Sequence, residues 1–132
     1  MITRDIQTHA HTEFQDVSAL VQDAVRESGI MSGVATIFVT HTTAGITINE
    51  NADPDVRSDL KYILDKIIPW NDPNYAHSEG NTAAHMKASL MGSSIQVIVE
   101  NGNLQMGTWQ GIYFCEFDGP RHRKIRIQVI GS

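Results

Sequence analysis

The sequence predicts an α+β fold, a single compact domain with a mainly antiparallel β-sheet and about three helices. Two observations lead to this class. Stretches with β-type patterns and helical patterns follow one another in an irregular order, which favours α+β over a regular alternation of strand and helix. The pair Asn101–Gly102 marks a tight hairpin, the connection that joins antiparallel strands. With 132 residues and no repeat or linker, residues 1–132 are predicted to form one domain.

Strands are expected in six stretches: 2–14, 33–41, 44–50, 94–100, 108–117 and 123–130. The fifth stretch is apolar on both faces, because Ile112 and Phe114 alternate with Tyr113, Cys115 and Phe117. A strand of this kind must be covered on both sides. Since three modest helices would leave part of the sheet uncovered, we expect a subunit interface.

Two of the three helical segments have clear boundaries. The first begins near Asp16, a plausible N-cap, and ends at Gly29. The second has Asp53 as N-cap and Pro54 at its first helical position, and it ends before Pro69. Its buried stripe is predicted to consist of Val56, Leu60, Ile63, Leu64 and Ile67.

The third helical segment, 81–92, follows a loop and contains part of the stretch HSEGNTAAH, residues 77–85. Its expected N-cap is Asn81 or Thr82. Its apolar face is predicted to consist of Ala83, Met86 and Leu90. Capping accounts for Asn81 or Thr82 but not for His77 or His85, which are therefore functional candidates.

Composition narrows the class of protein. The chain is 41% hydrophobic and 19% charged, as in ordinary globular domains, and its formal charge of −5 argues against nucleic acid or an anionic membrane as a partner. A single cysteine, Cys115, fits a reducing compartment, and a buried inert thiol is its expected state. No signal peptide or bilayer-spanning apolar run is visible. We expect a cytoplasmic protein that binds neither nucleic acid nor membrane.

A divalent metal, Zn or Mg, is one interpretation of the histidines. His41 ends a predicted strand, His77 lies in a loop and His85 lies on a helix, so the three could converge as metal ligands. Glu79 would then orient a ligand or act as a general base. The alternative is that each imidazole is bonded to a nearby backbone carbonyl.

Two other polar groups remain after capping and turns are accounted for. Asp53 is explained by the start of a helix, whereas Asn49 and Glu50 are left over and could face the same pocket as His41. In the turn DGPRHRK, residues 118–124, Arg121 could hold a phosphate through a bidentate fork. The alternative for this turn is a solvated basic surface.

Three long motifs resemble one family. THTTAGITINENADPDV, HSEGNTAAHMKASLMGSS and NGNLQMGTWQGIYFCEFDGPRHRKIRIQVIG occur in the order and spacing of the YjbQ-like family, also called the secondary thiamine-phosphate synthase family. The resemblance implies a homotrimer with histidine-lined pockets near the subunit contacts. The matched polar positions are His41, Thr42, Thr43, Asn49, Glu50, His77, Glu79, Asn81, His85, Thr108, Trp109, Gln110, Glu116, Asp118 and Arg121.

The activity that the resemblance implies joins a pyrimidine diphosphate to a thiazole phosphate and releases pyrophosphate. For this transferase we expect catalytic roles for Glu50, Glu79 and Asn49. The small phosphorylated substrate is expected to contact Thr42, Thr43, Asn81, Gln110 and Arg121. His41, His77 and His85 are the expected metal ligands. Two alternatives remain open: a zinc-type hydrolase at the histidine cluster, and a trimeric ligand-binding protein without catalysis.

Overall fold

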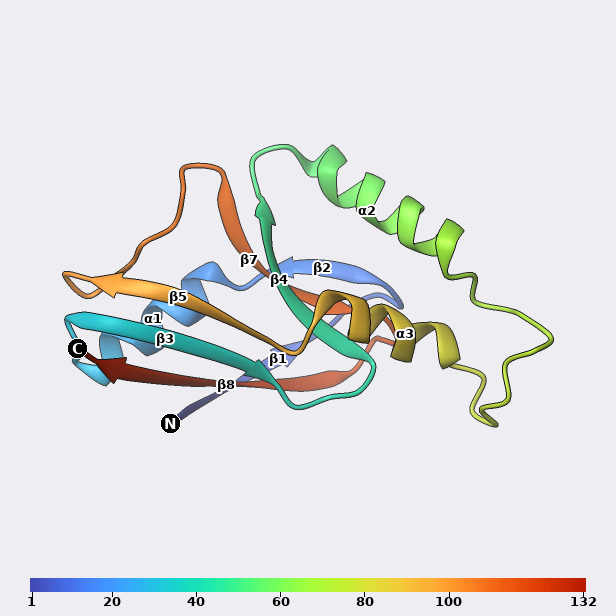
Figure 1. The fold of residues 1–132 in the computed structure, drawn as a ribbon, viewed down its shortest axis with the longest axis horizontal. Coiled ribbons are helices and arrows are strands. Elements are labelled where there is room, and N and C mark those ends of the chain that lie inside the picture. Colours follow the sequence, from blue (N-terminus) through green and yellow to red (C-terminus); the bar gives the residue numbers. More distant parts are fainter.

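A computed structural model describes all 132 residues as three helices and eight strands, arranged in two antiparallel sheets (Figure 1). In chain order the elements are β1 (Ile2–Gln7), β2 (Glu13–Asp16), α1 (Ser18–Ser28), β3 (Ser32–Val39), β4 (Ala44–Glu50), α2 (Pro54–Ile67), α3 (Thr82–Met91), β5 (Ser94–Glu100), β6 (Asn103–Leu104), β7 (Gln110–Glu116) and β8 (His122–Gly131). The α+β class and the antiparallel pairing are confirmed. None of the helices is long and apolar enough to cross a membrane.

The larger sheet has five strands in the order β1-β8-β3-β5-β6. Its inner face, α1 and one face of the smaller sheet enclose a core of 17 buried residues. The helix contributes Val21 and, one turn later, Ala24 and Val25, all on its inner face. The predicted tight turn joins β5 to β6, and both of its residues, Asn101 and Gly102, have positive φ (54° and 74°). This part of the fold follows directly from the sequence pattern.

The smaller sheet has three strands in the order β2-β7-β4, and β7 is its buried centre. Ile112 and Phe114 enter the large core, whereas Tyr113, Cys115 and Phe117 enter a second core of six buried residues. The prediction that both faces of this strand are covered is confirmed. Both covers come from the same chain, however, so β7 does not itself require a subunit interface. Burial raises the pKa of the Cys115 thiol far above its ordinary value, which makes it unreactive.

Three connections pass from one sheet to the other at the same end of the molecule. They are the segments 8–12, 40–43 and 117–121. The prediction of one continuous strand over 2–14 is therefore wrong: β1 belongs to the larger sheet and β2 to the smaller. The connections contact one another, since the backbone N–H of Thr8 donates to the carbonyl of Arg121 (3.0 Å) and that of Phe117 to the carbonyl of Thr43 (3.2 Å).

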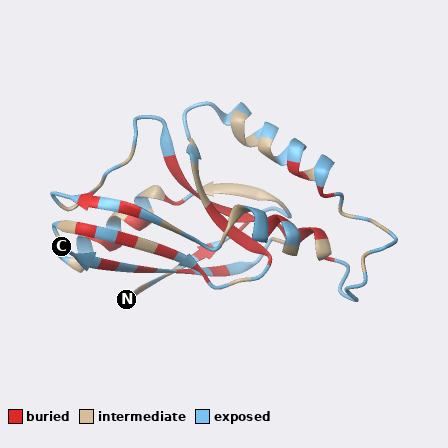
Figure 2. Ribbon diagram, in the orientation of Figure 1, coloured by how far each residue is buried: buried red, intermediate tan, exposed pale blue.

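The burial of α2 differs from the prediction. Asp53 caps the helix as expected, accepting a hydrogen bond from the backbone N–H of Asp55 (2.9 Å). Of the predicted stripe only Leu64 is buried, while Ile63 and Ile67 are 52% and 61% exposed (Figure 2). The periodic pattern correctly indicated a helix, but the rest of the chain offers its apolar face little to pack against.

The orientation of α3 also differs from the prediction. Met86 and Leu90 are exposed, and the residues that α3 buries are Ala83, Ala84, Lys87 and Ala88. The physical reason is the close approach of this helix to β4. A Cβ atom on Gly45 would lie 2.8 Å from the carbonyl oxygen of Gly92, so only small side chains fit between the two elements.

The starts of α1 and α3 carry no side-chain cap. The N-cap of α1 is Val17 rather than Asp16, although the Asp16 carboxylate accepts a hydrogen bond from the Ser18 N–H (2.9 Å). Asn81 occupies the N-cap position of α3, as expected, but its side chain makes no capping bond because it is turned to another partner.

Candidate functional site

A buried polar cluster holds the three crossing connections together. Glu116 is fully buried and Arg123 is 4% exposed. The Arg123 guanidinium donates to both carboxylate oxygens of Glu116, with 2.8 Å between Nε and Oε1, and to the hydroxyl of Thr43 (2.9 Å). The Thr8 hydroxyl donates to the same carboxylate (2.7 Å). The ion pair of Glu116 and Arg123, which flanks the third connection, is thereby bonded to Thr8 of the first connection and Thr43 of the second.

The environment of Glu116 keeps it ionised. Burial alone would raise the pKa of this carboxyl group, but hydrogen bonds from Arg123, Thr8 and the backbone N–H of Asp118 outweigh burial and hold the pKa below its ordinary value. The carboxylate also accepts from the backbone N–H groups of Phe117 and Asp118, each at 3.1 Å. The ion pair therefore fixes the backbone of the connection between β7 and β8.

A polar cavity of about 410 Å³ adjoins this cluster and has no hydrophobic residue in its wall. Its lining residues are Thr40, His41, Thr42, Thr43, His77, Glu79, Asn81, His85, Asp118, Arg121 and Arg123. An adjoining hollow shares His41, Thr42 and His85 and continues along α3 to Ser93. The structure thus brings together all three predicted histidines, Glu79, and four of the five predicted substrate contacts.

His41 is held by its ring nitrogen Nε2, which accepts a hydrogen bond from the backbone N–H of Lys124 (2.9 Å). The neutral ring then carries its proton on Nδ1, which remains as a donor. Partial burial and the nearby charge of Arg123 lower the pKa of His41 below its ordinary value. His41 is therefore a fixed, neutral imidazole that offers an N–H group, a suitable partner for an anionic oxygen.

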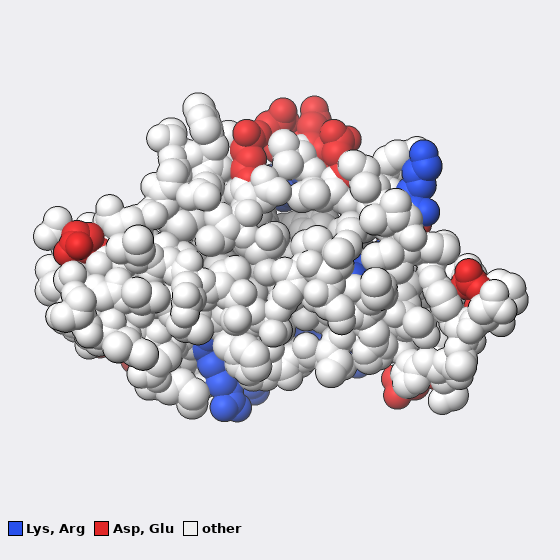
Figure 3. Space-filling model, viewed as in Figure 1, with Lys and Arg blue, Asp and Glu red and all other residues white.

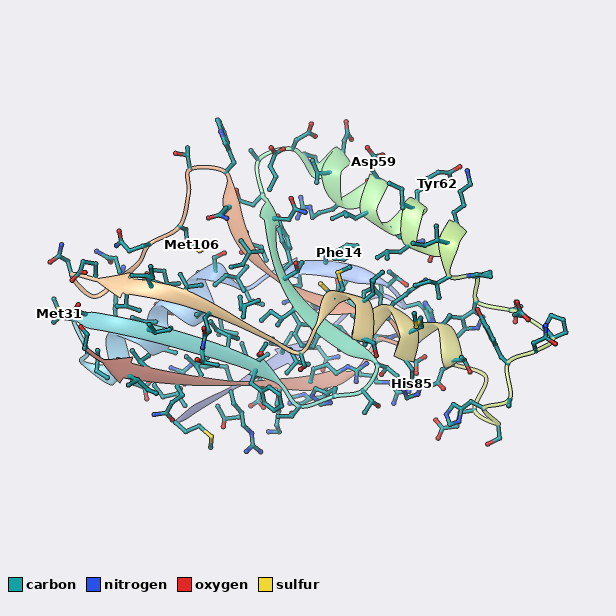
Figure 4. The ribbon with its side chains drawn as sticks, in the orientation of Figure 1. Phe14, Met31, Asp59, Tyr62, His85 and Met106 are labelled. Atoms are coloured by element: carbon teal, nitrogen blue, oxygen red, sulfur yellow. The ribbon has the colours of Figure 1, made fainter.

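His77 and His85 contact each other edge to face, with ring centroids 5.2 Å apart. His77 is exposed in the loop before α3, and His85 is half-buried on the helix, on the side away from α2 in the view of Figure 4. In the described arrangement no group of three or more His, Cys, Asp or Glu side chains is close enough to hold a metal ion. His41 has also committed Nε2 to the backbone, so the three imidazoles do not form a ready-made metal centre.

Asp118 links the helix start to the arginine. Its carboxylate oxygen Oδ2 accepts from Asn81 Nδ2 (2.9 Å) and from the Arg121 guanidinium (3.1 Å), and Arg121 Nε donates to the Asp118 carbonyl (2.7 Å). Arg121 remains 53% exposed and keeps donors free for a ligand. The Oδ1 atom of Asn81 and the hydroxyl of Thr82 are buried without a partner.

Three predicted site residues lie elsewhere. Asn49 and Glu50 end β4, and Gln110 pairs with Glu50 across the sheet. The cavity lies at the other end of β4, beside Thr43, so seven strand residues, or roughly 20 Å, separate the two positions. Because a β-strand is extended, Asn49 and Glu50 do not line the cavity of His41 in this chain. Gln110 instead accepts from the Gly107 N–H (2.8 Å).

Neither interpretation of the turn 118–124, a phosphate clamp or a solvated basic surface, uses the sequence signal that Arg123 carries. Arg123 is in phase with Ile125, Ile127 and Val129, the buried side of β8. A charged residue at a buried position of an alternating strand requires a partner. The partner, Glu116, occupies the buried strand β7. Nothing in the local sequence pairs the two, since they lie in different sheets.

Comparisons with known proteins identify the family of this chain. The model of the family described as UPF0047 protein YjbQ-like matches residues 2–132. UPF0047 protein YugU of Bacillus subtilis is 55% identical over 129 residues, covering 98% of both chains. A UPF0047 protein of Methanocaldococcus jannaschii is 48% identical over 127 residues, covering 96% of this chain and 91% of its own.

Solved structures give the same result. A YjbQ/UPF0047 family protein of Clostridium acetobutylicum has 56% identity and a TM-score of 0.95, with 98% of this chain and 100% of that chain covered. A conserved protein of Thermus thermophilus has 34% identity and a TM-score of 0.92 over the same shares. The fold, the order of the motifs and these relatives agree along the whole chain, which belongs to the UPF0047 family of YjbQ-like proteins.

Proposed function

We propose that the polar cavity is the active site of a thiamine-phosphate synthase-type transferase. The observation that carries the proposal is the cavity wall, which combines three imidazoles with a partly free guanidinium and contains no hydrophobic residue. Such a wall suits a small, highly charged substrate. The family resemblance supplies the reaction: a thiazole phosphate displaces pyrophosphate from a pyrimidine diphosphate.

The reaction needs little acid or base chemistry. The lone pair of the thiazole ring nitrogen forms a bond to the methylene carbon of the pyrimidine. The carbon–oxygen bond to the diphosphate breaks, and its electron pair leaves with pyrophosphate. Catalysis then consists of positioning the two substrates and stabilising the negative charge that develops on the leaving group.

The chain supplies donors for that charge. The hydrogen bond from the Lys124 backbone N–H fixes the direction of the His41 Nδ1–H group, and the bonds to Asp118 fix the free N–H groups of Arg121. Both contacts are present without substrate. His77 and His85 add imidazole nitrogens from the opposite wall. Thr42, Thr43 and Asn81 line the same space and complete the set of candidate substrate contacts. The diphosphate is expected to enter with Mg²⁺ as its counter-ion, because the protein as a whole is acidic.

The test is formation of thiamine phosphate from the two substrates by the purified protein, with Mg²⁺ and with EDTA. Arg121→Gln is expected to lower the rate at least tenfold, since one charge-assisted contact to the leaving group is worth about 1.4 kcal/mol or more. Arg26→Gln is the matched control, because Arg26 is an exposed arginine on α1. No product at saturating substrate would remove the proposal.

A zinc-type hydrolase is the second candidate, supported by the contact between His77 and His85 beside Glu79 and His41. His77, His85 and Glu79 would hold the ion if the exposed loop before α3 closed over the cavity. Metal analysis of protein purified without a histidine tag distinguishes the two candidates. One zinc per chain that is lost in His77→Ala and His85→Ala supports the hydrolase, and full transferase activity in metal-free protein with Mg²⁺ opposes it.

We also propose that the chain assembles as a homotrimer. Large apolar side chains are exposed on the outer side of the larger sheet and on α2 and α3: Val34, Phe38, Ile98, Ile130, Tyr62, Ile63, Ile67, Met86 and Leu90. Tyr62 projects from α2 away from the sheets (Figure 4). Exposed apolar surface of this extent is typical of subunit contacts. A monomer in light scattering at micromolar concentration would contradict the proposal. A trimer that binds the substrates but never turns them over would favour the non-catalytic alternative.

A further inference from the structure

A second cavity, of about 500 Å³, lies beside α3 and is larger than the polar cavity. Residues of α2, α3 and the segment after β1 line it, among them His11, Lys61, Asp65, Trp70 and Lys87. His85 lines the polar cavity and Lys87 the second one. Two residues turn a helix by about 200°. The helix α3 therefore presents an imidazole to one cavity and an ammonium group to the other.

The second cavity holds more positive than negative charge. The side chain of Lys87 is 3% exposed, and its Nζ lies 2.5 Å from Oδ1 of Asp65. The other oxygen of Asp65 accepts from Nζ of Lys61 (2.7 Å). Two ammonium groups thus share one carboxylate, which leaves a formal charge of +1 in a protein whose net charge is −5.

The position of Lys87 is the strongest sign of a ligand. Its neighbours on the buried side of α3 are Ala84 and Ala88, so an apolar residue would be the ordinary occupant of this position. A buried ammonium group is costly unless it is fully compensated. Asp65 is 42% exposed and already bonded to Lys61, so it compensates Lys87 only in part. An anion bound in the cavity would complete the compensation.

The wall of the second cavity is also partly aromatic. The ring of Trp70 contacts the ring of His11 edge to face, with centroids 4.5 Å apart and an interplanar angle of 82°. An indole held in this way offers a surface on which a flat ring can stack. An ammonium pair beside an aromatic wall matches a ligand that has a phosphate on one end and a heterocycle on the other.

The walls of the two cavities contact each other at one point. His11, which lines the second cavity, has Nε2 3.9 Å from Oδ1 of Asp118, which lines the polar cavity. A two-substrate transfer needs two anion subsites that adjoin. The polar cavity, with three imidazoles and Arg121, has the larger set of donors and suits the diphosphate.

We propose that the second cavity binds the thiazole phosphate, with its phosphate on the cavity side of Lys61 and Lys87 and its ring against Trp70. The proposal rests on the proposed transferase and assigns the second of its two substrates. It adds a binding site for a heterocyclic monophosphate formed by α2, α3 and the segment after β1.

The experiment measures binding of the thiazole phosphate alone by isothermal titration calorimetry, with the unphosphorylated thiazole alcohol as a second probe. Lys61→Gln and Trp70→Leu are each expected to weaken the affinity about tenfold or more, because each removes one of the two proposed contacts. Lys61 is exposed and Trp70 is half-buried, so both variants are expected to fold. Lys66→Gln, an exposed lysine on the same helix, is the matched control and should bind as the wild type does.

The outcomes separate this inference from the transferase. Weakened binding in Lys61→Gln and Trp70→Leu, with normal binding in Lys66→Gln and Arg121→Gln, supports the second site even if no thiamine phosphate is ever formed. Wild-type affinity in Lys61→Gln and Trp70→Leu overturns it even if turnover is normal, and leaves Lys87–Asp65 as a structural tie between two helices. Absence of binding to the wild-type protein also overturns it.

Discussion

The region around α1 and the region around α2 and α3 differ in how completely their apolar side chains are buried by the rest of the chain. The first encloses a core of 17 buried residues, the second a core of six. Helix α1 buries Val21, Ala24 and Val25, whereas α2, although longer, buries only Leu64. Both proposed binding cavities adjoin the second region. The difference indicates a well-packed scaffold and a less completely packed side, on which both proposed cavities lie.

Charged side chains are distributed unevenly along α2. Acidic side chains gather over the start of α2 in the view of Figure 3, with basic ones near its C-terminal end. The first turn of α2 includes Asp55 and its last turn Lys66, the arrangement that the helix dipole favours. Lys61, near the middle of α2, lines the second cavity.

The largest expected effect compares the two cores directly. Phe114→Ala removes a fully buried ring from the large core and is expected to cost about 3–5 kcal/mol of unfolding free energy. Leu64→Ala, in the small core, is expected to lower the unfolding free energy by about 2 kcal/mol. This is the low end of the range for buried leucines, because the site is open enough to relax. Urea unfolding at constant m-value measures both. Equal losses would show that the two regions are equally well packed.

The next effect concerns the ion pair between the sheets. Arg123→Met leaves the Glu116 carboxylate buried without its partner and is expected to cost about 3 kcal/mol at neutral pH. The pKa of Glu116 is lower in the folded protein than its ordinary value of 4.5. The stabilisation is therefore complete above pH 4.5 and is lost as the pH falls through the folded pKa. Unfolding measured from pH 7 downwards tests this, and a pH-independent stability in the wild type would contradict it.

A smaller effect tests how independent α2 is. Asp53→Ala removes the N-cap of this helix and is expected to cost about 1 kcal/mol locally. If α2 opens without the rest of the molecule, amide exchange should accelerate in α2 and stay unchanged in α1. Acceleration to the same extent in both helices would mean that the two regions unfold as one unit.

The smallest effect is a shift in one titration. His41 is expected to have a pKa below its ordinary value of 6.5, because burial and Arg123 disfavour its protonated form. Since the folded pKa is depressed, His41 lowers the stability of the fold as the pH falls below 6.5. Its ring-proton resonance followed by NMR gives the pKa. A midpoint at or above 6.5 would show that the imidazole is not fixed in its neutral form.

Much of the architecture was predictable because it depends on local patterns. Alternation defined β7 as a strand covered twice, Asp53 and Pro54 marked the start of α2, and Asn101–Gly102 marked a hairpin. Each of these features depends on residues that are neighbours in sequence. The histidines were likewise identifiable as candidates, since no capping or core role accounted for them.

The unpredicted features all depend on contacts between different elements of the fold. Which face of α3 is buried depends on how closely β4 approaches it at Gly45, and the role of Arg123 depends on Glu116 in the other sheet. No local pattern indicates that Lys87 is buried, yet the fold places it beside Asp65 of α2.

The amino-acid sequence by itself determined the helices, the strands, the tight turn and the three candidate histidines. The reason is that side-chain periodicity and turn chemistry act between near neighbours in the chain. Only the tertiary structure decided that His41, His77 and His85 share one cavity while Asn49 and Glu50 lie at the far end of an extended strand. It also decided that three connections cross between two sheets at one end, where a buried ion pair joins them. These outcomes depend on the summed packing of both sheets, which no local pattern contains.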